Sequence, residues 1–443
     1  MTKRPIPTIS PATPTTSPLR SAFIGCVLAL LAACGGGGGG SAPTAAPPTA
    51  ADEVKFVTDY LQDWYLWYRQ LPAIDPSAWS TPEQALAALK VPQDRYSYID
   101  TAATFDAFFD EGRALGFGFG YALVGGELWI RYVQPHSNAQ AAGLRRGDRI
   151  IAIDGTPMAT LVASNRVDAA LGPATEGFSA NFDLLRGTAA QSITMTKSWY
   201  TLANVLDARV IDRPGGKVGY LAFLSFTEPS RAEWLSALTQ VQEAGAQDIV
   251  VDLRDNGGGR LSVANLIASS LMPTGLDNAV GTVLEFNDRH TGSNLTYPLT
   301  PVANSGRVRR LVWITSARTC SASESLMTSL RPYMTAAVIG ETTCGKPVGF
   351  TPPEFNGKVY SIVTFRALNR DGFSDYFGGL APDCTVGEDY SRPYGDPAEA
   401  KLAAALQWLD GAGCPVATTK SVPPRESQAP RGIGGLHDLT GLR

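Results

Sequence analysis

Two strand–helix–strand units in the second half of the chain limit its possible folds more than any other feature. In the first unit, the strand "KVGYLAFLSF" begins at Lys217, a helical pattern begins at Pro229, and the buried strand "DIVVDLR" begins at Asp248. In the second unit, "LVWIT" begins at Leu311 and "AAVIG" begins at Ala336, with a helical pattern between them. Such units make parallel strands and bring the loops that follow them to one sheet edge. The sequence therefore predicts an α/β domain with its functional groups at that edge.

Three loops should meet at this edge, and each has a different chemical capacity. In "RDNGGGR", glycine N–H groups can approach a ligand closely and face developing negative charge. In "RTCSASESL", Ser321 lies at a predicted helix N-terminus, where the dipole and free N–H groups favour an oxyanion. The loop "ETTCGK" carries Lys346, one helix and one strand after Ser321. Burial lowers the pKa of a lysine from about 10.4 by up to several units, so a buried Lys346 can act as a base.

Histidine, the usual base for a serine nucleophile, is scarce in this chain. We expect His136, one of only three histidines, to be an exposed turn residue. His290 lies in the polar segment "NDRHTGSN", and His437 lies in a tail that contains Pro and Gly. A Ser/His/Asp triad built on His290 or His437 is the weaker alternative to Ser321 with Lys346.

The N-terminal region differs in composition from the rest of the chain. Three basic residues precede an apolar run from Ala22 to Ala33, which is too short to span a bilayer but suits a secretory signal. The run ends in "LAAC", which resembles the bacterial lipobox and implies lipid attachment at Cys34. We expect residues 1–33 to be the signal peptide and residues 34–52, which include six consecutive glycines, to be a flexible tether. The alternative is a signal peptide with a chance cysteine.

These features predict a protein of the bacterial cell envelope, anchored by lipid, with Gly35 compatible with sorting to the outer membrane facing the periplasm. The net charge of −4 and the absence of Lys/Arg blocks argue against a nucleic-acid partner. Besides Cys26 in the signal and Cys34, the chain has four cysteines: Cys320, Cys344, Cys384 and Cys414. An even set in an oxidising compartment suggests two disulfides in one of three pairings; buried free thiols are the alternative.

Between the tether and the α/β domain, two further regions are predicted. Apolar residues recur at helical spacing from Glu53 to about Lys90, which indicates a small helical domain over residues 53–103. The segment from Leu115 to Gly155 has the glycine loop, the helix "NAQAAGL" and the run "RRGDRIIAIDG" in an order that resembles a PDZ domain, assigned to residues 104–203. This resemblance implies that a loop binds a terminal carboxylate through backbone N–H groups while the ligand adds as a strand. The loop residues are Gly116, Phe117, Gly118 and Phe119.

The ordered motifs together resemble the carboxyl-terminal processing peptidases, or tail-specific serine proteases. "DRYSYID", "KVGYLAFLSF", "DLRDNGGG", "SASE", "GKP" and "GLAPDC" occur in the family's order over about four-fifths of the chain. The resemblance implies that Ser321 is the nucleophile and Lys346 the general base, with Glu324 supporting the lysine. The amides of Gly258 and Ala322 would form the oxyanion hole. Ser323 would be a helix-start or packing residue.

The sequence departs from the family at several of these positions. Where some members have a glutamine after the lysine, this chain has Phe350, and where others have an aspartate after the serine, it has Pro332. The identity of a third catalytic residue, besides Ser321 and Lys346, therefore stays open. Cys320 directly precedes the serine and Cys344 lies two residues before the lysine, and most family members do not have cysteine at these two positions. If these positions are adjacent, a disulfide ties the two loops, which favours Cys320 with Cys344 and Cys384 with Cys414.

The resemblance implies a crotonase/Clp-protease-like β-β-α superhelix core over residues 204–415, with an inserted PDZ β-domain, a small N-terminal helical domain and a disordered tail over residues 416–443. We expect an exported serine endopeptidase that cleaves proteins or peptides recognised by their C-termini. It would need no metal and no cofactor. The alternatives are a catalytically inactive, lipid-anchored PDZ protein that binds C-terminal tails, and a crotonase-like acyl-CoA enzyme.

Overall fold

The computed structural model describes residues 47–415 of the chain. The chain divides into a unit from Met1 to Pro47 and a second unit from Pro48 to Arg443, and the following description concerns the second. The predicted signal peptide, Cys34, most of the predicted tether and the tail over residues 416–443 lie outside the described residues. Within residues 47–415, every helix is too short or too polar to cross a membrane.

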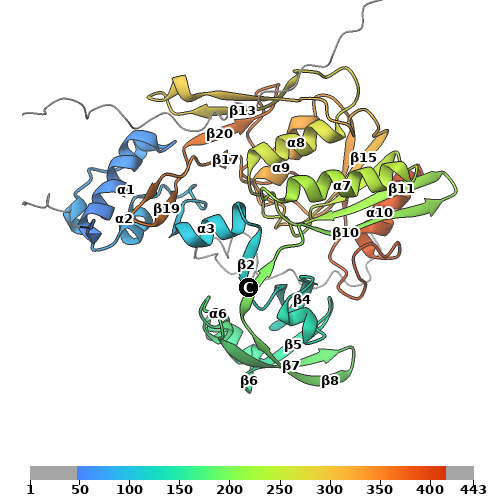
Figure 1. Cartoon of the computed structure of the whole chain (residues 1–443), viewed down its shortest axis with the longest axis horizontal. Helices are drawn as coiled ribbons and strands as arrows, with labels where there is room; N and C mark the ends of the chain where they lie inside the picture. The colour runs from blue at the N-terminus through green and yellow to red at the C-terminus, as the bar shows by residue number, and fades with distance from the viewer. Residues whose placement is uncertain (1–46, 416–443) are drawn as a thin grey trace, which may run out of the picture. The chain divides into compact units, whose positions relative to one another are not determined.

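A six-stranded sheet forms the centre of the α/β domain, in the order β10-β11-β12-β15-β16-β21 (Figure 1). Its strands are β10 (Val205–Arg213), β11 (Gly216–Phe223), β12 (Asp248–Asp252), β15 (Arg310–Thr315), β16 (Ala336–Gly340) and β21 (Cys384–Thr385). From β11 to β21 the neighbours are parallel, whereas β10 forms an antiparallel hairpin with β11. Both predicted strand–helix–strand units are therefore present with parallel strands.

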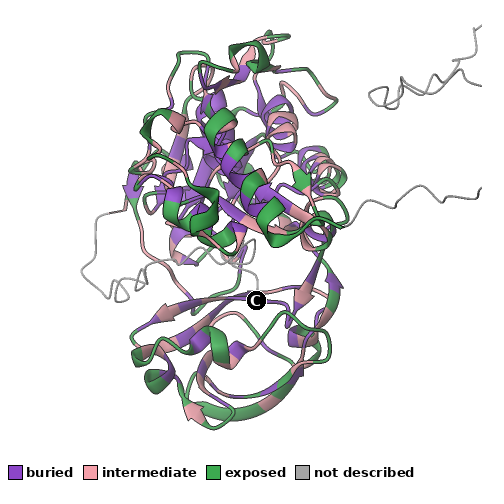
Figure 2. Cartoon of the chain, turned by 90° about the vertical axis from the view of Figure 1, so that its left-hand side faces the viewer, coloured by how far each residue is buried: buried purple, intermediate pink, exposed green. Residues whose placement is uncertain are grey.

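Helices cover both faces of this sheet, because successive side chains of its buried strands point in opposite directions. Val250 and Val312 belong to the core on the side of α10 (Ala400–Leu409). Val251 and Trp313 belong to the core on the other side. The helices on that side are α7 (Ser230–Glu243), α8 (Leu261–Leu271) and α9 (Ala322–Leu330). Figure 2 shows the buried strands between helices whose outer surfaces are exposed.

A second, four-stranded sheet lies beyond the central one in the order β14-β13-β20-β17, and the sequence patterns did not predict it. Its strands are β13 (Val280–Phe286), β14 (Leu295–Pro298), β17 (Val348–Gly349) and β20 (Phe365–Leu368), with a 3-10 turn, η3 (Thr291–Ser293), between β13 and β14. β17 directly follows the loop that carries Lys346 and pairs antiparallel with β20. This pairing fixes the position of the lysine-bearing loop.

The N-terminal helices share a core with the α/β domain. The helical elements are α1 (Ala50–Trp64), capped by Thr49, α2 (Pro82–Leu89), and the 3-10 turns η1 (Tyr68–Gln70) and η2 (Pro76–Ala78). Val57 and Leu61 pack in one buried cluster with Tyr360 and Ile362. β1 (Tyr98–Thr101) pairs with β19 (Lys358–Ser361), which in turn pairs with β18 (Glu354–Phe355). The helices and the segment after β17 therefore form one packing unit.

The PDZ-like domain is attached through a two-stranded stem. α3 (Ala102–Phe109) leads into β2 (Arg113–Gly116), which pairs antiparallel with β9 (Ser198–Thr201), so the chain enters and leaves the domain side by side (Figure 1). The domain's sheet has the order β3-β4-β5-β7-β8, with β6 paired to β5. Its elements are β3 (Phe119–Val124), β4 (Glu127–Val133), α4 (Asn138–Ala141), β5 (Arg149–Ile153), β6 (Thr156–Pro157), α5 (Met158–Ala163), α6 (Val167–Leu171), β7 (Ser179–Arg186) and β8 (Ala189–Thr196).

Candidate active site

Ser321 is the N-cap residue of α9 and has an unusual backbone conformation. Its φ of 58° and ψ of −113° lie where side-chain-bearing residues are rarely found, a conformation that costs about 1–3 kcal/mol. Neighbouring hydrogen bonds hold it there. Cys320 N donates to the carbonyl of Asn256 at 3.1 Å, and Ser325 N donates to the carbonyl of Ser321 at 2.8 Å. The backbone thus presents the Ser321 side chain, which belongs to a half-buried residue, at the predicted sheet edge.

The glycine loop after β12 passes directly over Ser321. Gly258 has a φ of 107°, and a Cβ atom at this position would lie 2.8 Å from the Ser321 Cβ and 3.0 Å from the Ala322 nitrogen. Only glycine fits both the conformation and the space. The predicted oxyanion donors, Gly258 and Ala322, are therefore neighbours. In this structure Gly258 N–H donates to Asn256 Oδ1 at 2.9 Å, so a substrate oxyanion would compete with that side chain.

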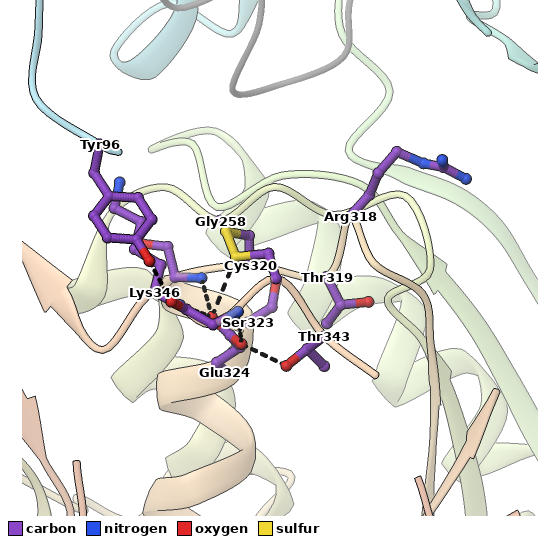
Figure 3. Close-up of a disulfide and its surroundings, with 12 residues drawn as sticks. Tyr96, Gly258, Arg318, Thr319, Cys320, Ser323, Glu324, Thr343 and Lys346 are labelled. Atoms are coloured by element: carbon purple, nitrogen blue, oxygen red, sulfur yellow. Dashed lines mark hydrogen bonds between the residues drawn. A yellow bond between two sulfur atoms is a disulfide. The ribbon is translucent and has the colours of Figure 1, made fainter. Parts of the chain in front are cut away.

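Glu324 joins the serine loop to the lysine loop. One carboxylate oxygen accepts hydrogen bonds from Ser321 N at 2.9 Å and Lys346 N at 2.8 Å. The other accepts from Gly345 N at 2.8 Å and from the Thr343 hydroxyl (Figure 3). Burial raises the pKa of Glu324, and these hydrogen bonds partly oppose the rise. Glu324 therefore acts on Lys346 by fixing its backbone and by its charge.

Lys346 is buried, with 5% of its surface exposed, and it lines the same pocket as Ser321. Burial lowers the pKa of its amine from 10.5 to about 8, against the opposing charges of Asp94 and Glu324. Asp94 belongs to the "DRYSYID" segment near the N-terminus and is itself buried, where it accepts hydrogen bonds from Tyr65 Oη at 2.8 Å and Tyr96 N at 3.0 Å. A substantial fraction of Lys346 is therefore neutral near pH 8.

The pocket around Ser321 and Lys346 has one polar side and one apolar side. Gly257, Gly258 and Gly259 line it together with Ser225. The apolar wall is formed by Tyr98, Phe109, Leu224 and Phe350. Phe109 and Leu224 come from α3 and the segment after β11, so the wall combines residues that are distant in sequence. The sequence patterns did not predict these wall residues.

Two disulfides have the pairing favoured from the sequence, Cys320 with Cys344 and Cys384 with Cys414. The first lies beside the Ser321 and Lys346 loops (Figure 3). Ligand atoms of Cys320, Cys344 and Glu324 lie within 4.8 Å of one another, a spacing that suits a metal ion. The two sulfurs are bonded to each other, however, and so are not available as thiolate ligands.

A buried ion cluster connects the PDZ-like domain to the glycine loop. Asp255, three residues before Gly258, pairs with Arg131 of β4 and accepts from Arg318 Nε at 2.9 Å. It also accepts a hydrogen bond from the hydroxyl of Tyr394. Burial alone would raise the pKa of Asp255, but the two arginines outweigh burial and hold it well below its usual range. The sequence motifs do not predict this cluster, because its members come from four distant segments.

The predicted carboxylate-binding loop lies at one end of the PDZ-like domain. Phe117 and Phe119 have fully buried rings in that domain's core, so only the loop backbone is placed to meet a ligand. β3, which begins at Phe119, is an edge strand of its sheet, and an extended peptide can add to such an edge. Gly118 has a φ of 93° and leaves no space for a Cβ, which would lie 2.1 Å from the Ser137 Cβ.

The remaining predicted residues have other partners. His290 stacks on Trp64, with ring centroids 3.5 Å apart, and its Nε2 lies 3.1 Å from Asp63, which places it against α1 rather than in the Ser321 pocket. His136 is an exposed turn residue before α4, and His437 lies outside the described residues. Ser323 is fully buried and donates to the carbonyl of Asn256 at 3.1 Å, which is a packing role.

Comparison with known proteins matches three family descriptions along the chain. Residues 217–386 match "Peptidase family S41", residues 52–98 match "Peptidase S41 N-terminal domain", and residues 129–163 match "PDZ domain". A structure from Bacteroides fragilis NCTC 9343 assigned to the S41 proteases covers 84% of this chain and 100% of its own, with a TM-score of 0.68 and 24% identity. That likeness shows the same fold.

Two curated relatives are carboxyl-terminal-processing proteases from cyanobacteria. The protein of Synechocystis sp. is 28% identical over 65% of this chain, and that of Picosynechococcus sp. is 29% identical over 58% of this chain. The matched regions span 66% and 59% of these relatives, slightly less than two thirds of their lengths. The family matches and the relatives agree on one assignment. The chain belongs to peptidase family S41, among the carboxyl-terminal processing peptidases that carry a PDZ domain.

Proposed function

We propose that the chain is a serine endopeptidase in which Ser321 is the nucleophile and Lys346 is the general base. The observation that carries the proposal is that a buried lysine with a pKa lowered to about 8 lines the same pocket as a serine at a helix N-terminus. The names of the relatives support the same reaction. Neutral Lys346 supplies the base that the scarce histidines do not.

Hydrolysis would proceed through an acyl-enzyme. Lys346 Nζ takes the proton of Ser321 Oγ as the oxygen attacks the scissile carbonyl, and the resulting oxyanion faces backbone N–H groups of Ala322 and Gly258. The lysine then returns the proton to the leaving amine and activates the water that releases the acyl group. For Gly258 to donate, its N–H must leave or share Asn256 Oδ1. This sequence of steps requires neither metal nor cofactor.

We further propose that the PDZ-like domain selects substrates by their C-terminal tails. β3, an edge strand of its sheet, and the backbone of the loop Gly116–Phe119 fit an added strand with a free carboxylate. The buried pair of Arg131 with Asp255 gives the domain a direct connection to the glycine loop. Peptides or unfolded proteins with accessible C-termini are therefore the proposed substrates.

Cleavage of an unfolded protein by matched variants tests the proposed activity. Wild type, Ser321→Ala and Ser329→Ala would be incubated with the substrate, and the fragments mapped by mass spectrometry. Ser329 is buried in α9, and within residues 47–415 its hydroxyl bonds only to a carbonyl of its own helix, at 2.9 Å, so it controls for the loss of a buried hydroxyl. We expect fragments from wild type and Ser329→Ala and none from Ser321→Ala.

The rival function is tail binding without hydrolysis. It predicts that wild type binds peptides with free C-termini, that amidation of the peptide weakens this binding, and that no fragments form at any pH between 6 and 10. Phe350 and Pro332, which replace polar residues found in other family members, motivate this rival. The lowered pKa of the Lys346 amine favours the enzyme, because a binding protein has no use for a buried lysine that loses its proton readily in the same pocket as a serine.

We propose that the protein is exported and held at the bacterial outer membrane, facing the periplasm, by lipid on Cys34. The proposal rests on the sequence "LAAC" after an apolar run and on the pair of disulfides, which form and persist in oxidising compartments. Cell fractionation of wild type and Cys34→Ser tests it. Wild type should be recovered with membranes, and Cys34→Ser should not; equal recovery would contradict the anchor.

A further inference from the structure

The amine of Lys346 lies against the face of an aromatic ring. Its Nζ is 4.1 Å from the centroid of Phe350 and 5.5 Å from that of Tyr96. Among residues 47–415, no side chain makes a hydrogen bond or ion pair with this amine. The carboxylates that face it, Asp94 and Glu324, accept hydrogen bonds from backbone and hydroxyl groups instead. The amine therefore lies over two aromatic rings, with Phe350 the nearer of the two.

The backbone explains why the ring and the amine meet. Phe350 follows Lys346 by four residues, with the two-residue strand β17 (Val348–Gly349) between them, so the two side chains come from the two ends of one short segment. Tyr98 contacts the Phe350 ring edge-on, at 5.9 Å between centroids and 85° between planes, which limits its rotation. Phe350 is half-buried and lines the pocket beside Ser321.

We propose that the Phe350 ring stabilises the protonated form of Lys346 during the reaction, and so takes the place of a hydrogen-bonding third group. The inference rests on the proposed function, in which Lys346 is the base. When Ser321 Oγ bonds to the carbonyl carbon, its proton moves to Nζ and an ammonium forms next to the negatively polarised ring face. The ring attracts the ammonium and not the neutral amine, so it favours the transition state over the ground state. It cannot accept the proton, which stays available for the leaving nitrogen.

The Phe350 ring should raise the pKa of the Lys346 amine, because it favours the charged form. Phe350→Leu keeps an apolar group in place but removes the ring, so burial lowers the pKa of Lys346 further. Asp94, Glu324 and the Tyr96 ring still face the amine and are unchanged. The acid limb of the rate profile should move to lower pH by roughly 0.4 to 1.5 units, and the plateau rate should fall roughly two- to thirtyfold. Phe350→Trp keeps the ring face and should leave the limb at or above its wild-type pH.

The control is Phe355→Leu. Phe355 stacks on Phe56 at 4.6 Å and packs in the same cluster as Phe350, but has no contact with the lysine amine. The titration of Lys346 would be followed by NMR on protein with ¹³C-labelled lysine, in which its signal is the one missing from Lys346→Met. The rate profile would be measured on the same samples with an unfolded substrate.

A lower Lys346 pKa in Phe350→Leu than in wild type and Phe355→Leu, with the acid limb moved in the same direction, supports the inference. An active Phe350→Leu protein whose Lys346 titration is unchanged overturns it, even if its melting temperature has fallen. Absence of Ser321-dependent hydrolysis by wild type overturns the proposed function itself. The NMR titration does not depend on activity, so the two failures are distinguishable.

Discussion

Cys320 and Cys344 are joined by a disulfide, which ties the residue before Ser321 covalently to the loop that carries Lys346. Glu324 ties the same two loops by hydrogen bonds to Ser321 N and Lys346 N. The serine loop and the lysine loop are thus held both covalently and by a buried carboxylate. Their relative position should depend on both.

Loss of this disulfide should lower activity more than loss of the other one. The two bonds link cysteines 24 and 30 residues apart, so each should stabilise the fold by about 3–4 kcal/mol. Only the first ties together the loops of Ser321 and Lys346, the proposed nucleophile and base. We expect Cys320→Ser/Cys344→Ser to lose roughly tenfold or more in kcat, measured well below its melting temperature. Cys384→Ser/Cys414→Ser should lose similar stability and keep its kcat; equal kcat losses in both variants would contradict this view.

The pH dependence of hydrolysis should follow the lysine. Burial lowers the pKa of Lys346 to about 8, and only the neutral amine can accept the proton of Ser321. We expect kcat/KM to rise with pH to a plateau with a midpoint near pH 8, and to fall about tenfold per pH unit well below it. Asp94→Asn removes a charge that favours the ammonium, so its midpoint should lie at lower pH. A midpoint near pH 6.5 in wild type would point to histidine instead.

Lys346 should reduce the stability of the fold that contains it. Below pH 8 the amine is protonated in both the folded and the unfolded state, so the free energy of folding includes the full cost of burying its charge. This cost disappears as the pH rises from about 8 to 10.5, because the folded protein loses the proton first. This difference in pKa corresponds to about 3 kcal/mol. Lys346→Met should therefore be more stable than wild type at pH 7, by up to about that amount, and the gain should shrink at pH 10. Denaturant unfolding at both pH values measures it, and a gain that does not change with pH would exclude this cause.

Gly258→Ala should abolish activity because its Cβ would contact Ser321. Gly216 provides a matched control, since its φ of 118° is as unfavourable for alanine but a Cβ there would meet nothing within 4 Å. Both variants should lose about 1–3 kcal/mol of stability from the backbone conformation. We expect only Gly258→Ala to lose hydrolysis, with a displaced Ser321 in its crystal structure. Normal hydrolysis by Gly258→Ala would argue against a role for this loop.

The sequence predicted the features that depend on short stretches of residues, namely the strands, the helices between them and the loops that follow the strands. The parallel units follow from the strand and helix patterns around Lys217 and Leu311, and the edge-loop argument brought Ser321 and Lys346 to one pocket. The disulfide pairing followed from the same adjacency.

What the sequence did not predict depends on contacts between distant segments. The charge of Asp94 raises the pKa of Lys346 from a segment near the N-terminus, and the "DRYSYID" motif alone does not predict which residue Asp94 faces. Asn256 competes for the Gly258 N–H through a side-chain rotamer that no pattern encodes. Phe350 appeared only as a departure from the family, and its ring becomes informative once its distance to an amine is known.

The shared core of the N-terminal helices and the β17–β19 segment has a consequence for biosynthesis. Asp94 and Tyr96 are made early, whereas Lys346 and the strand that pairs with β1 are among the later residues to leave the ribosome. The lysine can become buried only after the segment with Asp94 and Tyr96 has packed against the segment that carries Lys346. A nascent chain should therefore be inert towards itself and its neighbours, and it should become able to hydrolyse peptides only when folding is complete.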